Sequence, residues 1–307
     1  MSGGETLSTL GGLLNVPIVL AAAPLFEGVL RKVTAVVQSR QGPPITQPYL
    51  DLLKLLGKED IESGEIPVAQ RAAVWLALAT ALTLARFVPM GFPAPMDPGG
   101  DVILLIYLMT FSGICTLLMA MAAGSTYSLM GMSREMMTMI ALEPLFAVAL
   151  VVGAVHTHSL RLNAVLDGSV YAVGAPISGI LLLGVLALSF QAFVQRVPFD
   201  ISEAETELME GPLLEYSGPK LALCKYAQMV KLVVYSGLFV ALFAPWGSGL
   251  AFPLGWLWFW AKVLVVVLLV TLVAATHARY RIDQALKLFA GLLAVSMVAL
   301  VCATFGY

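Results

Sequence analysis

Apolar residues dominate eight stretches of the chain, each about 20 residues long, and polar residues gather between them. A stretch of this length crosses the ~30 Å hydrocarbon core of a bilayer as a helix. The stretches are continuously apolar and do not alternate with a period of two, which favours helices over the strands of a barrel. The predicted spans are roughly 13–33, 70–89, 101–122, 136–157, 174–195, 221–244, 254–276 and 286–305.

The composition indicates a chain that lipid surrounds. Of 307 residues, 59% are hydrophobic and only 12% are charged, whereas a soluble domain has roughly a quarter charged residues. We find no internal repeat and no second soluble domain, and residues 1–15 lack the basic residues and cleavage site of a signal peptide. The expected fold is an all-α integral membrane protein with one transmembrane domain over residues 1–307.

Basic residues lie mainly in the odd-numbered loops between the predicted spans. Of 17 Lys and Arg residues, thirteen flank these loops, two lie in even-numbered loops, and Lys231 and Lys262 fall inside spans. Because basic residues mark cytoplasmic loops, we expect a multi-pass inner-membrane protein with loops one, three, five and seven in the cytoplasm and both termini outside. The thirteen are Arg31, Lys32, Arg40, Lys54, Lys58, Arg71, Arg134, Arg196, Lys220, Lys225, Arg279, Arg281 and Lys287, and the two are Arg86 and Arg161.

The first cytoplasmic loop, about 34–69, contains a short amphipathic segment. Between Tyr49 and Leu56, apolar residues recur at helical spacing and charged residues occupy the other face. This pattern predicts a helix that lies in the membrane interface and ends at Gly57.

The fifth loop, about 196–220, holds six acidic residues within 16 positions. In a helix over 200–210, Glu203, Glu207 and Glu210 would share one side, and Glu205 would point the opposite way. Crowded like charges raise the pKa of at least one member, which suits a cluster that holds a proton. A solvated acidic loop is the simpler alternative. The six are Asp200, Glu203, Glu205, Glu207, Glu210 and Glu215.

Acidic residues also occur in the predicted spans. Glu27 lies in the first span, Glu135 opens the fourth, and Glu143 lies about a third of the way into it, just before Pro144. An intramembrane charge is costly and therefore faces protein or water, and proline tends to kink a helix. A carboxyl group at a kinked, polar point suits a proton relay, and a structural hydrogen bond to a neighbouring helix is the alternative.

Two lysines also fall inside predicted spans. Lys231, in the middle of a span, is expected to be neutral or paired with an acid such as Glu143. Its alternative is to extend toward the membrane interface, which suits Lys262, nine residues from Pro253, better.

The spacing of cysteine and histidine offers no metal site. The cysteines are scattered through apolar runs without a CxxC pair, so we expect small buried residues and no iron–sulfur or zinc site in this chain. His156 and His158 lack a third ligand and are expected at a solvent edge, and His277 suits a neutral hydrogen-bonding role. The cysteines are Cys115, Cys224 and Cys302.

Several segments, in order along the chain, resemble the complex I subunit 1 family, the heel of the membrane arm beside the quinone site. The acidic fifth loop is a highly specific match, and the family's eight-helix topology agrees with the count of spans. The matches run from residue 38 to residue 287. The segments are 38–43 with 47–56, 124–135, Glu143, 198–218 and 278–284.

Within this family, the first loop is similar to that of the membrane subunit of energy-converting nickel–iron hydrogenases, of the Ech, carbon-monoxide-linked and formate hydrogenlyase types. Gly42-Pro43 runs directly into residues 44–47, without the insert usual in the quinone-reducing branch. Residues 215–218 and 229–231 also look more like the hydrogenase branch.

The resemblance implies a non-catalytic subunit that anchors a peripheral arm and links hydrogen evolution to proton or sodium translocation. It implies hydrogenase large and small subunits and an iron–sulfur electron-transfer subunit as partners, which carry the nickel–iron and iron–sulfur centres, together with antiporter-like membrane subunits. The electron donor, whether ferredoxin, formate or carbon monoxide, stays open. The alternatives are the quinone-site subunit of a complex I-type NADH:quinone oxidoreductase and a stand-alone secondary transporter, which should show repeated halves.

Two groups of candidate residues follow from the resemblance and from the charge pattern. The candidates for the ion path are Glu143, Glu203, Glu205, Glu207, Glu210, Asp200, Glu135, Lys231 and Glu215. The candidates for docking the peripheral arm are Gln38, Arg40, Gly42, Pro43, Asp51, Lys54, Arg134, Tyr216, Arg279, Arg281 and Asp283.

Overall fold

The computed structural model describes residues 3–61, 67–92, 100–166, 176–244, 246–247 and 253–306, with the backbone alone for residues 3–11, 205 and 206. Throughout this part of the chain the regular elements are helices, and the strand-like contact is an isolated bridge between Asp101 and Arg161. The predicted all-α fold is therefore confirmed.

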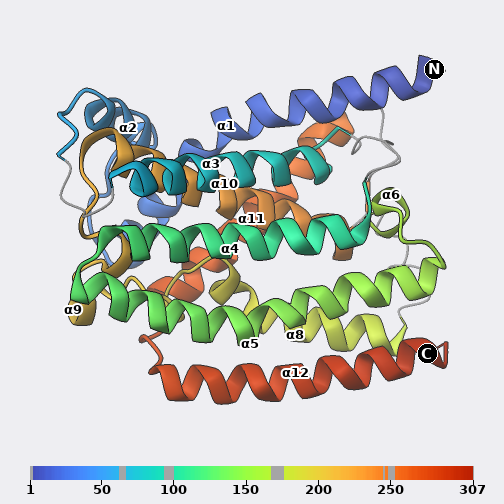
Figure 1. Ribbon diagram of the computed structural model, residues 1–307. Coiled ribbons are helices and arrows are strands. Elements are labelled where there is room, and N and C mark those ends of the chain that lie inside the picture. The colour runs from blue at the N-terminus through green and yellow to red at the C-terminus, as the bar shows by residue number, and fades with distance from the viewer. Residues whose placement is uncertain are drawn as a thin grey trace.

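Long helices run side by side as a bundle (Figure 1). Both chain termini and α6 lie at one end of it, and α2 and α9 lie at the other, which we call the loop end. The long helices are α1 (Gly3–Val37), α3 (Pro67–Phe87), α4 (Val102–Ala123), α5 (Thr126–Thr157), α10 (Gly218–Phe243), α11 (Leu254–Thr276) and α12 (Ile282–Thr304). The shorter ones are α2 (Gln47–Leu56), α6 (Leu162–Val165), α8 (Ile177–Phe193), α9 (Glu205–Leu208) and the 3-10 helix η1 (Gly211–Leu213).

Seven helices of the described residues are long and apolar enough to cross a membrane, which confirms a multi-pass membrane fold. α8 is also apolar but has 17 residues, about 26 Å at 1.5 Å per residue. The termini lie at the same end of the bundle (Figure 1), as an even number of crossings requires. Counting α8 as a span satisfies this requirement, and the eighth crossing stays a prediction.

α5 begins at Thr126, whereas the prediction placed the start of this span at residue 136. The reason is local: α4 ends at Gly124, which has a φ of 71°, and the side chain of Ser125 accepts a hydrogen bond from the Ser128 amide at 3.2 Å. Residues 126–135, expected in a loop, therefore form the first turns of α5.

The helix predicted in loop one is present as α2 and ends at Gly57. A 2.8 Å ion pair between Arg31 of α1 and Asp51 holds α2 against the end of α1. Leu50 and Leu53 remain exposed. Their exposure suits a helix that rests on lipid, and the interfacial position of α2 stays a prediction.

No helix spans the whole of 200–210. α9 covers four residues, and the three residues that follow it, 209–211, have φ angles of 53°, 71° and 47°, which break a helix. The interpretation that Glu203, Glu207 and Glu210 share one helix face is therefore wrong, and each carboxyl group has a different environment.

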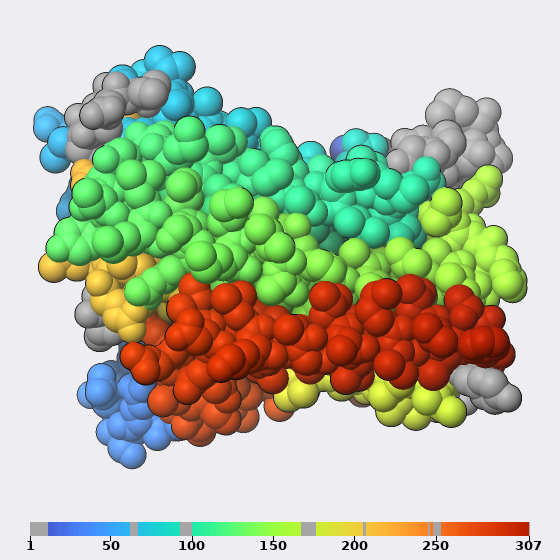
Figure 2. Space-filling view, turned by 60° about the horizontal axis from the view of Figure 1, so that its bottom comes forward, coloured from blue at the N-terminus to red at the C-terminus, as the bar shows by residue number. Residues whose placement is uncertain are grey.

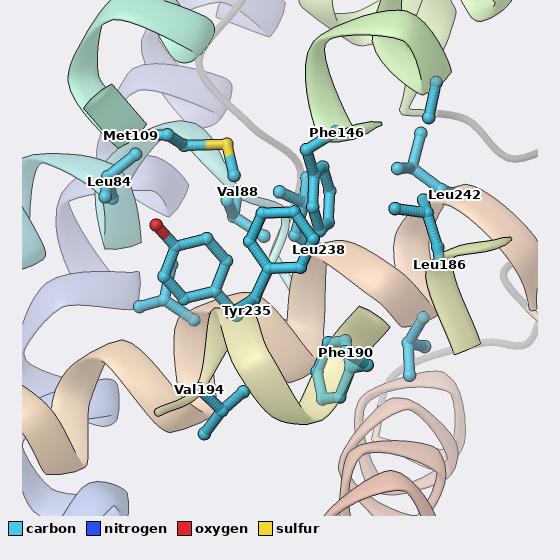
Figure 3. Packing of buried hydrophobic residues seen from close by; sticks show 14 of the residues in the cluster. Leu84, Val88, Met109, Phe146, Leu186, Phe190, Val194, Tyr235, Leu238 and Leu242 are labelled. Carbon is cyan, nitrogen blue, oxygen red and sulfur yellow. The ribbon is translucent and has the colours of Figure 1, made fainter. Parts of the chain in front are cut away.

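α10 has the largest share of buried residues among the long helices. Its Tyr235, Leu238 and Leu242 pack against side chains from α5 and α8, such as Phe146 and Phe190 (Figure 3). Because lipid is as apolar as these side chains, their packing stabilises the bundle through close contacts and not through escape from water.

The acidic segment 200–210 packs against α5 through backbone contacts that need glycine. A Cβ atom at Gly211 would lie 2.2 Å from the carbonyl oxygen of Ser202, and one at Gly131 of α5 would lie 3.0 Å from the same oxygen. Gly211 also has a left-handed φ, which costs other residues about 1–2 kcal/mol.

We predict that Gly211→Ala lowers the stability of the protein by about 1–3 kcal/mol, because the new methyl group displaces the Ser202 carbonyl. The melting temperature in detergent measures the effect. Gly291→Ala in α12 is the matched control, since a Cβ there meets open space, and it should be neutral or stabilising by up to about 1 kcal/mol. Equal melting temperatures for the two variants would refute the proposed contact.

Candidate functional site

A polar cavity of about 290 Å³ lies near the loop end of the bundle, between α1, α10 and residues 194–213. We call it the acidic cavity. A void of this size holds several water molecules, because one needs only about 10–15 Å³. Its charged and amide side chains are Glu27, Arg31, Gln195, Arg196, Asp200, Glu203, Glu210, Lys225, Gln228 and Lys231.

Glu27 is held by two arginines at the edge of this cavity. Arg196 donates to it at 2.5 Å, and Arg31, one turn further along α1, lies 3.5 Å from it. Glu27 is only 5% exposed. Arg31 also pairs with Asp51, so one chain of charges links α2, α1 and loop five. Glu27 is not among the candidates predicted from the sequence, although an arginine at i+4 was a usable signal.

Glu203 has an environment that favours its protonated form. It is half-buried in the wall of the acidic cavity, and Gln228 of α10 donates a hydrogen bond to it at 2.5 Å. Removal from water, and then the nearby charges of Asp200 and Glu135, raise the pKa of Glu203 from 4.5 to about 8. At neutral pH this carboxyl group therefore carries a proton.

Glu207, four residues further along the chain, has an environment that favours its ionised form. Its side chain is 55% exposed, and Arg134 of α5 donates a hydrogen bond to it at 2.5 Å. This hydrogen bond, together with the Arg134 charge, holds the pKa of Glu207 below its usual value. Asp200 accepts from Arg279 at 3.0 Å. Glu207 is therefore a surface ion, and it lines neither the acidic cavity nor the inner cavity described next.

The inner cavity, of about 50 Å³, lies beside the middle of α5. Gln195 and Lys231 line both cavities and so form the boundary between them. Glu135 is buried and accepts a hydrogen bond from Gln195. The polar side chains of the inner cavity are Thr110, Glu135, Glu143, Gln195, Lys231 and Tyr235.

Lys231 and Glu143 face the same inner cavity, as the suggested pairing requires, but they form no ion pair among the described residues. The ammonium of Lys231 instead lies 5.7 Å from the ring centre of Tyr235, where the aromatic face attracts it. Lys262 donates to the Ala244 and Trp246 carbonyls at the end of α10, in agreement with the expected extension toward an interface.

The remaining ion-path candidates do not form one cluster. Glu210 lines the acidic cavity. Glu215 is half-buried and lines neither cavity. The side chain of Glu205 lies outside the described residues. Sequence reasoning missed Gln195 and Gln228, because an uncharged amide in a loop or helix carries no distinctive signal.

Some of the docking candidates are exposed, and the others are buried or bonded to other residues of this chain. Tyr216 is buried, and its hydroxyl donates to the Met119 carbonyl at 2.9 Å, so it offers no surface to a partner. Gly42 is half-buried, and its carbonyl accepts from Lys32 at 3.1 Å. Asp51, Arg134 and Arg279 form the ion pairs described above. The exposed candidates are Gln38, Arg40, Pro43, Lys54 and Asp283 together with Arg281.

Known proteins resemble this chain in sequence and in fold. The family model described as NADH dehydrogenase matches residues 11–304. Hydrogenase-4 component C of Escherichia coli (strain K12) is 35% identical over 88% of this chain and 87% of its own length. Formate hydrogenlyase subunit 4 of the same organism is 32% identical over 90% of this chain and 92% of its own length. Among solved structures, a chain of the membrane-bound sulfane sulfur reductase, an archaeal respiratory membrane complex, matches with a TM-score of 0.84 and 26% identity, over 96% of this chain and 98% of that chain.

The raised pKa of Glu203 predicts a pH-dependent stability. Because the folded pKa, about 8, exceeds the ordinary 4.5, the folded state binds the proton more tightly than the unfolded state does. Stability should therefore fall as pH rises through the window between these two values. Glu203→Gln, which resembles the protonated carboxyl group, should remove this decrease, as melting temperatures in detergent between about pH 5 and pH 8 will show. Glu207→Gln is the control and should keep it; parallel curves for wild type and Glu203→Gln would count against the buried environment of Glu203.

Proposed function

The chain belongs to the NADH dehydrogenase family, the family of complex I subunit 1, and on this premise we propose that it is the membrane anchor and ion-coupling subunit of an energy-converting nickel–iron hydrogenase. The observation that carries the proposal is the pair of adjoining cavities, one beside the acidic segment at the loop end and one beside Glu143 within α5, which share the lining residues Gln195 and Lys231. The two hydrogenase relatives favour this branch of the family over the quinone-reducing one.

The peripheral arm docks at the loop end, which we assign to the cytoplasm. Exposed residues of loop one, Arg40 and Lys54 among them, supply positive charge there. The nickel–iron and iron–sulfur centres belong to the docked subunits. The three cysteines support this assignment, because they lie on three different helices, α4, α10 and α12, and Cys115 and Cys224 are buried among apolar side chains.

Coupling starts at Glu203. A negative charge that leaves the docked arm lowers the pKa of nearby carboxyl groups and so favours release of the proton that Glu203 holds, and a negative charge that arrives favours its rebinding. Glu203, with its pKa near neutrality, is the acid most responsive to such a change. Water in the two cavities, with Gln195 and Lys231 between them, provides the route from Glu203 to Glu143.

An antiporter-like membrane subunit covers Glu143 on the face formed by α4 and α5. The Glu143 side chain is only partly buried, and it lies near Gly113 of α4, where an added Cβ atom would be 3.2 Å from its carboxyl oxygen. A carboxyl group at this depth is costly to expose to lipid. The outer sides of α4 and α5, seen next to α12 in Figure 2, carry exposed apolar residues such as Phe111 and Ile140, which suit a helix–helix interface.

Purification of the tagged chain from its membrane in mild detergent tests the proposed function. We expect nickel, iron and hydrogen-evolving activity to co-purify with it. Quinone reduction without nickel would assign the chain to the quinone-reducing branch instead. A metal-free single protein would contradict both assignments and favour the transporter.

We further predict that Glu203→Gln and Glu143→Gln leave hydrogen evolution in the presence of an ionophore intact but lower ion translocation by roughly tenfold or more, because a glutamine cannot pass on a proton. Acidification or sodium uptake in membrane vesicles measures translocation. Asp101→Asn is the matched control, because Asp101 precedes α4 and is bridged to Arg161 beside α6, at the end of the bundle opposite the loop end. Glu207→Gln should have a smaller effect, since Glu207 is a surface ion. Normal translocation in both test variants would remove these acids from the path.

A further inference from the structure

An apolar groove of about 370 Å³ runs between α8, α10, α11 and α12. Leu188 of α8 and Leu269 of α11 form its rim and are 60% and 57% exposed. The floor is made of residues such as Phe239 and Val270, and His277 and Tyr280 close the end near the α11–α12 turn. The groove therefore opens sideways, toward the lipid that surrounds the bundle.

The length of the groove matches one leaflet of a bilayer. Along α11 it extends from Val266 to His277, about 16 Å at 1.5 Å per residue, or roughly half of a ~30 Å hydrocarbon core. A groove of this length that is lined mainly by apolar side chains suits an extended hydrocarbon chain.

A second, basic pocket adjoins the groove at its closed end. This pocket, of about 200 Å³, contains Arg134, Arg279 and Arg281 against two acids, Glu207 and Asp283. Arg134 and Arg279 already form ion pairs. Arg281, by contrast, has no carboxylate partner among the described residues and is exposed. Its guanidinium group is available to an anion at the membrane surface.

Tyr280 forms the boundary between the groove and the basic pocket, since it lines both. Its ring stacks on Phe199 with 5.2 Å between ring centres, and its amide donates to the Pro198 carbonyl at 2.9 Å. A ligand that fills the groove and reaches the pocket would therefore touch the beginning of loop five.

We propose that the groove and the basic pocket together bind one anionic phospholipid, with an acyl chain in the groove and the headgroup phosphate at Arg281. The length and apolar lining of the groove select the chain, and the exposed guanidinium of Arg281 selects the anion. The bound lipid supports the Pro198–Phe199 wall and so stabilises loop five on its outer side. This proposal does not depend on the hydrogenase assignment.

Native mass spectrometry of the purified complex tests the proposal. The complex is stripped with detergent and then exchanged into micelles that contain phosphatidylglycerol or phosphatidylcholine. We expect one retained phosphatidylglycerol per copy of this chain. Leu269→Trp, which fills the groove from its exposed rim, should lower this retention by roughly tenfold. Arg281→Gln should lower the preference for phosphatidylglycerol over phosphatidylcholine by roughly fivefold.

Leu257→Trp is the matched control, because Leu257 is another exposed leucine of α11, outside the groove. It should retain lipid like the wild type. A melting temperature without added lipid confirms that each variant is folded, and exposed positions such as these tolerate a larger side chain. Equal retention of phosphatidylglycerol in Leu269→Trp and Leu257→Trp would show that the retained lipid is ordinary lipid around the bundle and not lipid bound in the groove, and it would overturn the proposal. So would loss of the peripheral subunits from Arg281→Gln with an unchanged lipid preference, which would assign the pocket to a protein partner.

Discussion

A carboxyl group that leaves water must be paired, hydrogen-bonded or protonated, and the acids of this bundle meet this requirement in three ways. Glu27 is paired with Arg196, Glu135 accepts a hydrogen bond from Gln195, and Glu203 has a raised pKa and holds a proton. Because Gln195 and Arg196 are neighbours in the chain, one short turn after α8 serves acids on both α5 and α1. This turn therefore supplies the partners of two of the buried acids.

Loop five is also tied to loop one. Lys220, at the start of α10, is buried and pairs with Asp60 at 3.2 Å. Ser217 exchanges hydrogen bonds of 3.0 and 3.2 Å with the backbone of Ile61. Since loop one holds most of the exposed docking candidates, a partner that binds there acts on the same segment that positions the acids. Anchoring and coupling are thus properties of one connected structure.

Much of the fold could be predicted from local patterns. The long helices were visible because a membrane span has a length and a continuous apolar composition that few other structures share. α2 was visible because its apolar and charged residues alternate with the helical period. The start of α5 was misplaced, because the glycine and serine that end α4 and cap α5 lie in a polar segment that resembles any loop. The break after α9 depends on left-handed residues that no periodicity reveals.

The sequence by itself determined that this chain is a membrane protein, which of its loops carry the charged residues, and which family it resembles. It could do so because composition and motifs are properties of neighbouring residues. Only the tertiary structure decided which acids of the fifth loop matter for the buried site. Glu203 and Glu207 are chemically identical and four residues apart, yet one lines a cavity beside Gln228 and the other is paired on the surface with Arg134. Burial and charge partners are set by helices distant in the chain, and for this reason no spacing rule could separate the two.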